Sequence, residues 1–170
     1  MSAEEDGFED FVRSHSSSLI GGAWMVTGDR GEAEDVVQTV LIRVGARWKL
    51  VRAMANPGAY CRKAVMNEAL SWRRKRRAMP LATIDEAPEP SLGPDERVAG
   101  EQNVLTLLMT LPRGQRAVIV LRYLYDLTEA QTADELGISL GTVKSQTSRA
   151  LTTLRRPEPS LRGDQDVRAL

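Results

Sequence analysis

A helical segment near the carboxyl end of the sequence has the residue types that a DNA-reading helix needs. At 3.6 residues per turn, one face of residues 139–156 carries hydroxyl and basic side chains and no acid. This face comprises Thr142, Ser145, Ser148, Arg149, Thr152 and Arg156, with Lys144 on its flank. Such donors suit a helix lying in the major groove, where base edges and phosphates accept hydrogen bonds. The opposite face comprises Val143, Thr147, Ala150, Leu151 and Leu154, and is expected to pack inward.

A helix-turn-helix over residues 128–156 would turn this polar face outward. Thr128 is a good N-cap for a short first helix, and Ser139 caps the second helix. Gly137 ends the first helix, since glycine takes the left-handed conformation at little steric cost. An ordinary helical hairpin on the surface is the alternative. The turn spacing, the small Ala133 and the acid-free face together favour the DNA-binding motif.

Charge is segregated along the 170 residues, although the formal net charge is zero. Residues 1–40 hold nine acidic and two basic side chains, whereas residues 43–79 hold eleven basic and one acidic. Residues 80–103 return to six acidic and one basic. The overall balance therefore hides a concentrated basic segment, which favours contact with nucleic acid.

Other classes of protein find little support in the sequence. The single cysteine, Cys61, excludes an internal disulfide and fits a reducing compartment. The acidic N-terminus has no apolar signal segment, and no apolar run approaches the ~20 residues that span a bilayer. We therefore expect a cytoplasmic protein. His15, the only histidine, has no second ligand nearby, and no phosphate-binding loop or nucleophile motif occurs, so we expect no metal, no cofactor and no enzymatic activity.

The sequence predicts an all-α chain of two small helical domains joined by a flexible linker. Helices are expected over residues 32–48 and 59–77, and over 112–125 before the helix-turn-helix. Four of the eight prolines fall among the acids of the linker, a composition that cannot form a packed core. The expected division is a first domain 1–79, a linker 80–103, a second domain 104–156 and a polar tail 157–170.

Two helices of the first domain have polar faces opposite their apolar stripes. On helix 32–48, Asp35, Gln38 and Ile42 lie opposite a valine stripe. They form either a partner-binding patch or a polar surface with one exposed isoleucine, and this helix alone favours neither.

On helix 59–77, one face combines an aromatic ring, cations and an amide: Tyr60, Lys63, Asn67 and Arg74. It leads into the basic run WRRKRR, which includes Arg73. Such a face suits the stacking of unpaired bases and contact with phosphates. The alternative is that the aromatic residues are core residues and the cations are only solvated.

Three segments resemble, in order, parts of bacterial sigma factors of the sigma-70 family. GDRGEAEDVVQTVLIRV resembles the polymerase-binding part of region 2, and NPGAYCRKAVMNEALSWRRKRR resembles the part that melts and reads the −10 element. LPRGQRAVIVLRYLYDLTEAQTADELGISLGTVKSQTSRALTTLR resembles region 4, which reads the −35 element. No region 3 lies between these segments, and in this the chain resembles the extracytoplasmic-function (ECF, group 4) subfamily. VMNEALSWRRKRR resembles its actinobacterial SigE-like branch.

The resemblance implies an RNA polymerase sigma factor that directs promoter-specific initiation. Docking on the clamp helices of the largest polymerase subunit is implied for Asp35, Gln38 and Ile42. Contact with the −10 element is implied for Tyr60, Lys63, Asn67, Arg73 and Arg74, beside a base-capturing loop at 49–58. Contact with the −35 element is implied for residues of the helix at 139–156, and the outward hydroxyls of that helix join them. The full set is Thr142, Lys144, Ser145, Gln146, Ser148 and Arg149.

Further partners implied by the resemblance are the flap of the second-largest polymerase subunit, promoter DNA and an anti-sigma factor. Three positions depart from the family pattern. Tyr60 stands where tryptophan is common, Gly45 where a large aromatic is common, and Gln146 where arginine is frequent. A free-standing helix-turn-helix regulator, which would bind DNA without polymerase, is the alternative function.

Overall fold

The computed structural model describes residues 3–78 and 99–156, and side chains within 7–71 and 103–156. These residues form helices and no strand. The first domain contains α1 (Ala3–Thr27), α2 (Arg30–Gly45), α3 (Trp48–Val51) and α4 (Pro57–Ala78). The second contains α5 (Ala99–Met109), α6 (Arg113–Ile119), the π-helical turn η1 (Val120–Leu124), α7 (Glu129–Leu136) and α8 (Leu140–Leu154). The predicted all-α class with two helical domains is confirmed.

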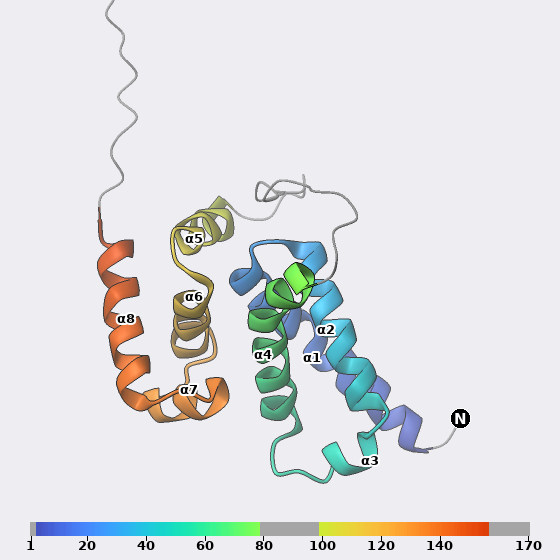
Figure 1. Cartoon of the computed structure of the whole chain (residues 1–170). Helices are drawn as coiled ribbons and strands as arrows, with labels where there is room; N and C mark the ends of the chain where they lie inside the picture. The colour runs from blue at the N-terminus through green and yellow to red at the C-terminus, as the bar shows by residue number, and fades with distance from the viewer. Residues whose placement is uncertain (1–2, 79–98, 157–170) are drawn as a thin grey trace, which may run out of the picture.

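In the first domain, α1, α2 and α4 pack around a core of small and β-branched side chains (Figure 1). The chain turns between α1 and α2 at Gly28 and Asp29. Gly28 has a positive φ of 81°, and Asp29 caps α2 by accepting a hydrogen bond from the Glu32 amide at 2.6 Å. The valine stripe of α2 is buried as expected. The helix ends at Gly45, however, and the predicted extension to Trp48 is wrong because the chain turns there into the short α3.

In the second domain, the expected single helix over 112–125 changes its hydrogen-bonding pattern near its end. The Tyr125 amide donates to the Val120 carbonyl at 3.2 Å, a five-residue spacing that defines the π-helical turn. Asp126 then adopts a left-handed φ of 52°. This turn redirects the chain into the helix-turn-helix and orients Tyr125 toward the first domain.

The predicted helix-turn-helix is confirmed in its details. Thr128 and Gln131 form a reciprocal capping box at the start of α7. Gly137 ends α7 in the left-handed region, at φ 63°, and Ser139 caps α8 through the Thr142 amide.

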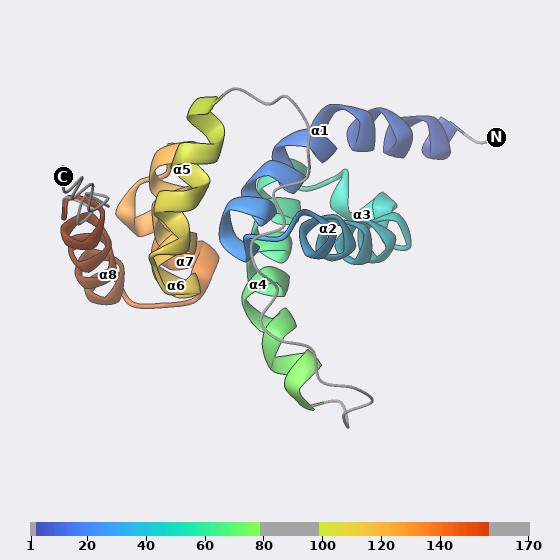
Figure 2. The ribbon, with the colours of Figure 1, turned by 90° about the horizontal axis from the view of Figure 1, so that it is seen from above.

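The two domains pack side by side, a contact that the sequence did not predict. Helices α6 and α7 lie against α4 and α1, and the two views agree on this arrangement (Figures 1 and 2). One apolar cluster runs through both domains and includes Val65 of α4 and Ala117 of α6. The expected linker 80–103 falls outside the described residues up to Val98, and α5 begins within it at Ala99. The expected tail 157–170 also lies outside them.

Candidate nucleic-acid and polymerase surfaces

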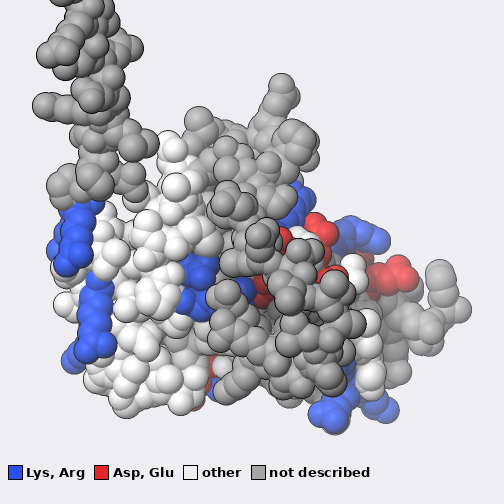
Figure 3. Space-filling model, turned by 45° about the horizontal axis from the view of Figure 1, so that its top comes forward, with Lys and Arg blue, Asp and Glu red and all other residues white. Residues whose placement is uncertain are grey.

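Helix α8 presents the predicted polar face to solvent. Val143, Thr147 and Ala150 are buried against the rest of the second domain, which fixes the rotation of the helix. The residues left exposed include the predicted Lys144, Ser145, Ser148 and Arg149. Figure 3 shows cations along this edge of the molecule, surrounded by uncharged surface. The face itself carries no acid and can approach a polyanion, although Glu129 at the start of α7 lies 4.0 Å from Lys144 Nζ.

Two members of the predicted −35 set are placed differently. The hydroxyl of Thr142 lies 2.8 Å from the Ser139 hydroxyl, so it also supports the start of α8. Gln146 is half-buried and faces α6, where a Cβ built on Gly114 would lie 3.6 Å from its Oε1. That oxygen is buried and has no hydrogen-bond partner among the described residues. Gln146 thus stands apart from the other members of the set, between two helices.

Helix α2 exposes the predicted trio on its outer face. Asp35 and Gln38 are exposed, and Ile42 is 73% exposed. Their partners on the opposite face, such as Val36 and Val40, are buried. A largely exposed isoleucine between polar neighbours on a rigid helix can serve as an apolar anchor for a docking protein.

The amino-terminal half of α4 gathers the predicted residues for contact with unpaired DNA. Tyr60 is 39% exposed, and Lys63 and Asn67 follow it on the same side. The preceding loop, which includes α3, exposes the apolar side chains of Leu50 and Met54. Arg73 and Arg74 lie in the last part of α4, outside the side chains that the structure describes.

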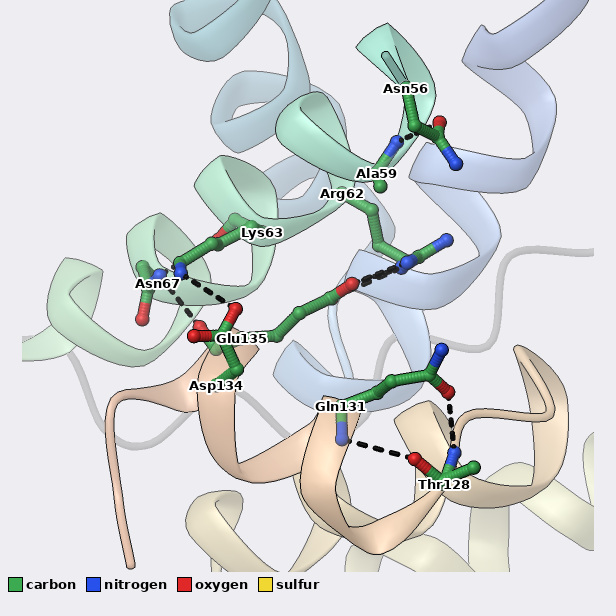
Figure 4. A network of polar contacts seen from close by, with 9 residues as sticks. All are labelled: Asn56, Ala59, Arg62, Lys63, Asn67, Thr128, Gln131, Asp134 and Glu135. Atoms are coloured by element: carbon green, nitrogen blue, oxygen red, sulfur yellow. Dashed lines mark hydrogen bonds and ion pairs between the residues drawn. The ribbon is translucent and has the colours of Figure 1, made fainter. Parts of the chain in front are cut away.

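This face of α4 is partly covered by the carboxyl end of α7 (Figure 4). Lys63 Nζ lies 3.4 Å from an Asp134 carboxylate oxygen, and Asn67 Nδ2 donates to the Glu135 carbonyl at 3.2 Å. Arg62 forms a bidentate pair with Glu135, with Nε 3.1 Å and 3.2 Å from the two carboxylate oxygens. Two residues with predicted DNA contacts, Lys63 and Asn67, are therefore held by the carboxyl end of α7 in the other domain.

Arg62 and Glu135 were not predicted as functional residues. Their side chains are only 17% and 9% exposed, and the Arg62 guanidinium also lies 5.2 Å from the Tyr125 ring centroid. These partners are 73 residues apart and belong to different domains, so no local sequence pattern could predict that they pair. The one available signal was an acidic pair at the end of α7, in the otherwise cation-rich context of a DNA-binding motif.

Two further residues of the second domain, Arg113 and Tyr125, also contact the first domain. Arg113 of α6 lies 2.8 Å from Glu32 of α2 and donates to the Ala69 carbonyl of α4 at 3.0 Å. The hydroxyl of Tyr125 donates to the Ser18 carbonyl of α1 at 2.7 Å. Burial raises the pKa of Tyr125, so the phenol stays protonated and able to donate at neutral pH.

The described residues contain no group of three or more His, Cys, Asp and Glu side chains that could hold a metal ion. None of the helices drawn in colour in Figure 1 combines the length and the apolar composition that crossing a bilayer requires. Cys61 is buried in α4, and burial raises the pKa of its thiol to about 11. It is therefore a neutral core side chain at physiological pH.

The chain is similar to known proteins along most of its length. Residues 11–79 match the family described as Sigma-70 region 2, and residues 101–154 match Sigma-70, region 4. The chain is 34% identical over 163 residues to the RNA polymerase sigma-E factor of Streptomyces coelicolor, covering 96% of this chain and 91% of that relative. It is 34% identical over 146 residues to the ECF RNA polymerase sigma factor SigL of Mycobacterium tuberculosis, covering 83% and 82%.

A solved structure shares the fold. The sigma factor RpoE of Bartonella quintana, in complex with the anti-sigma factor NepR, aligns with a TM-score of 0.64 at 24% identity. The alignment covers 87% of this chain and 94% of that chain.

Proposed function

Because this chain belongs to the sigma-70 family of RNA polymerase sigma factors, we propose that α4 and α8 are the two helices with which it reads promoter DNA. As a sigma factor of the ECF kind, it binds core polymerase and directs promoter-specific initiation of transcription. Its two domains, which we place at residues 1–79 and 104–156, divide the −10 and −35 elements between them.

Helix α8 reads the −35 element through its exposed face. Arg149 and Lys144 can donate to guanine or to phosphates, and Ser145 and Ser148 can approach base edges closely because they are short. Thr142 contributes near the start of the helix. For Gln146 to reach a base, its side chain must leave its position against α6, which would also give its buried oxygen a partner. The observation that carries this proposal is the acid-free exposed face of a confirmed helix-turn-helix.

Helix α4 and the loop before it contact the −10 element. Tyr60 offers a half-exposed ring for stacking on an unpaired base, although tryptophan is common at this position in the family. Lys63 and Asn67 lie on the same side, and Arg73 and Arg74 extend the basic segment. The loop 49–58 would receive the flipped base.

Polymerase supplies both the scaffold and the chemistry. Asp35, Gln38 and Ile42 dock on the clamp helices of the largest subunit, and the second domain meets the flap of the second-largest subunit. Holding both domains on one surface converts two weak DNA contacts into a strong one. The chain is not itself an enzyme and works in the cytoplasm. We infer that an anti-sigma factor is a further partner, because the sigma factor RpoE, which shares the fold, was solved in complex with the anti-sigma factor NepR.

Run-off transcription from a pool of genomic fragments tests this function. Core polymerase alone should give no discrete transcripts, and adding the protein should produce a defined set. Arg149→Ala should weaken every transcript about tenfold, as expected for one bidentate or phosphate contact. The matched control Arg13→Ala, an exposed arginine of α1, should leave them unchanged. If the protein binds duplex DNA but never redirects core polymerase, the sigma function is wrong and a free-standing helix-turn-helix regulator is the better explanation.

A further inference from the structure

The acidic end of α7 occupies the face of α4 that would contact single-stranded DNA. Three polar groups of α4 are engaged at once: Arg62 with the Glu135 carboxylate, Lys63 with Asp134, and Asn67 with the Glu135 carbonyl (Figure 4). A carboxylate held beside a guanidinium presents the same charge and acceptor geometry as a phosphate oxygen.

We propose that Asp134 and Glu135 act as an intramolecular mimic of the DNA backbone, which keeps α4 closed until polymerase separates the two domains. This inference rests on the proposed role of α4 at the −10 element. It extends that role, because it assigns a regulatory function to two acidic residues of a DNA-binding motif.

The pair with Glu135 contributes more than the pair with Asp134. Asp134 is 82% exposed and its contact with Lys63 spans 3.4 Å, so solvent and salt weaken that interaction. The Glu135 carboxylate is 9% exposed and accepts hydrogen bonds from both Nε and Nη2 of Arg62. A desolvated bidentate pair loses much more than an exposed pair when one partner is neutralised.

The closed arrangement blocks one function and leaves the other surfaces accessible. Ile42 of α2 is 73% exposed, and Arg149 of α8 is exposed. Polymerase can therefore dock on α2 while the domains are closed. Binding of the second domain elsewhere on polymerase would then separate α7 from α4. Free protein would be unable to hold melted DNA, and the holoenzyme would be able to do so.

The first experiment neutralises the acids of the mimic. In Asp134→Asn/Glu135→Gln, two charges are lost at the contact. The matched control Asp10→Asn/Glu34→Gln loses two surface charges of the first domain, on α1 and α2 and away from α7 and α8. Binding of free protein to a fluorescent single-stranded oligonucleotide is measured by anisotropy. The contact variant should bind about tenfold more tightly than the control variant.

The second measurement follows the distance between the domains directly. Donor and acceptor dyes are placed on Glu9→Cys and Arg155→Cys, both exposed, while the native Cys61 stays buried and unreactive. The contact variant should lose energy transfer in the absence of polymerase, whereas the control should keep it. Gly22→Ala, which opens the same contact without changing any charge, should give the same loss.

These outcomes separate the inference from the function on which it rests. If the contact variant keeps wild-type energy transfer, or opens without gaining affinity for single-stranded DNA over the control, the mimic is wrong. Core-dependent transcription by the wild-type chain is scored independently. If the wild-type chain gives no core-dependent transcripts, the proposed sigma function of α4 and α8 is wrong. If it gives them but the contact variant keeps wild-type energy transfer and affinity for single-stranded DNA, only the proposed mimic is wrong.

Discussion

Gly22→Ala should open the contact between the two domains while making the first domain more stable. Gly22 lies in α1, one helical turn after Ser18, whose carbonyl accepts the Tyr125 hydroxyl at 2.7 Å. A Cβ at residue 22 would lie 2.9 Å from Cε2 and Cζ of the Tyr125 ring, and closer still to its hydroxyl oxygen. Real side chains do not tolerate such approaches, so Tyr125 must leave its place.

The magnitude follows from two opposing effects. Within the first domain, alanine in a helix interior is favoured over glycine by about 0.5–1 kcal/mol. Displacing Tyr125 costs its hydrogen bond, about 0.5–1.5 kcal/mol. Repacking the ring costs about 1–3 kcal/mol. Closure of the domains should therefore weaken by about 2–4 kcal/mol, which is roughly a 30- to 900-fold change in its equilibrium constant.

Gly21→Ala provides the matched control. It adds the same methyl group to the same helix, and nothing lies within 4 Å of a Cβ built there. Energy transfer between dyes on the two domains should fall for Gly22→Ala and stay at the wild-type level for Gly21→Ala. Both variants of the isolated first domain, if it folds alone, should melt above wild type. Equal energy transfer in the two variants would refute the packing of Tyr125 against α1.

Three other variants test the core, a cap and the polymerase surface. The free energy of unfolding should fall by roughly 2–3 kcal/mol between pH 9 and 11. Burial raises the pKa of the Cys61 thiol to about 11, whereas in the unfolded chain this thiol ionises near 9.0. In denaturant melts, Cys61→Ala should lose this part of the pH dependence. Thr128→Ala removes the capping box and should cost about 1 kcal/mol in the same assay, with Thr152→Ala as the exposed control. Ile42→Asp should lower affinity for core polymerase by about tenfold in a competition assay. Its melting temperature should stay near wild type, because the side chain is exposed.

Local chemistry was enough to predict the helix-turn-helix and the two outer faces. A hydroxyl cap, a left-handed glycine and a second hydroxyl cap act over a few residues, so Thr128, Gly137 and Ser139 carry their meaning in the sequence itself. The exposed positions of Asp35 and Gln38 likewise follow from helical periodicity. These predictions needed no knowledge of the other domain.

The π-helical turn and the contact between domains depend on information that is distant in the sequence. At Val120–Leu124 no proline or glycine marks the change of pattern, and the turn is stabilised by where it places Tyr125. Arg113 is similar, because its partners lie on three helices of the first domain. A basic residue after Pro112 looks like an ordinary exposed side chain until those helices are in place.

Gly45 shows how packing can account for a departure from a family pattern. A large aromatic is common at this position in sigma factors, and glycine has a low helix propensity. In this chain Phe8 of α1 occupies the adjacent space, with its ring 3.1 Å from a Cβ built on residue 45. The Trp48 ring is tilted against both phenylalanines, with centroids 5.4 Å from Phe8 and 5.0 Å from Phe11. The aromatic group is supplied by α1 instead of α2. Glycine at residue 45 therefore leaves room for Phe8, whose ring would have to shift if a Cβ were present. The end of α2 is held by packing where helix propensity is low.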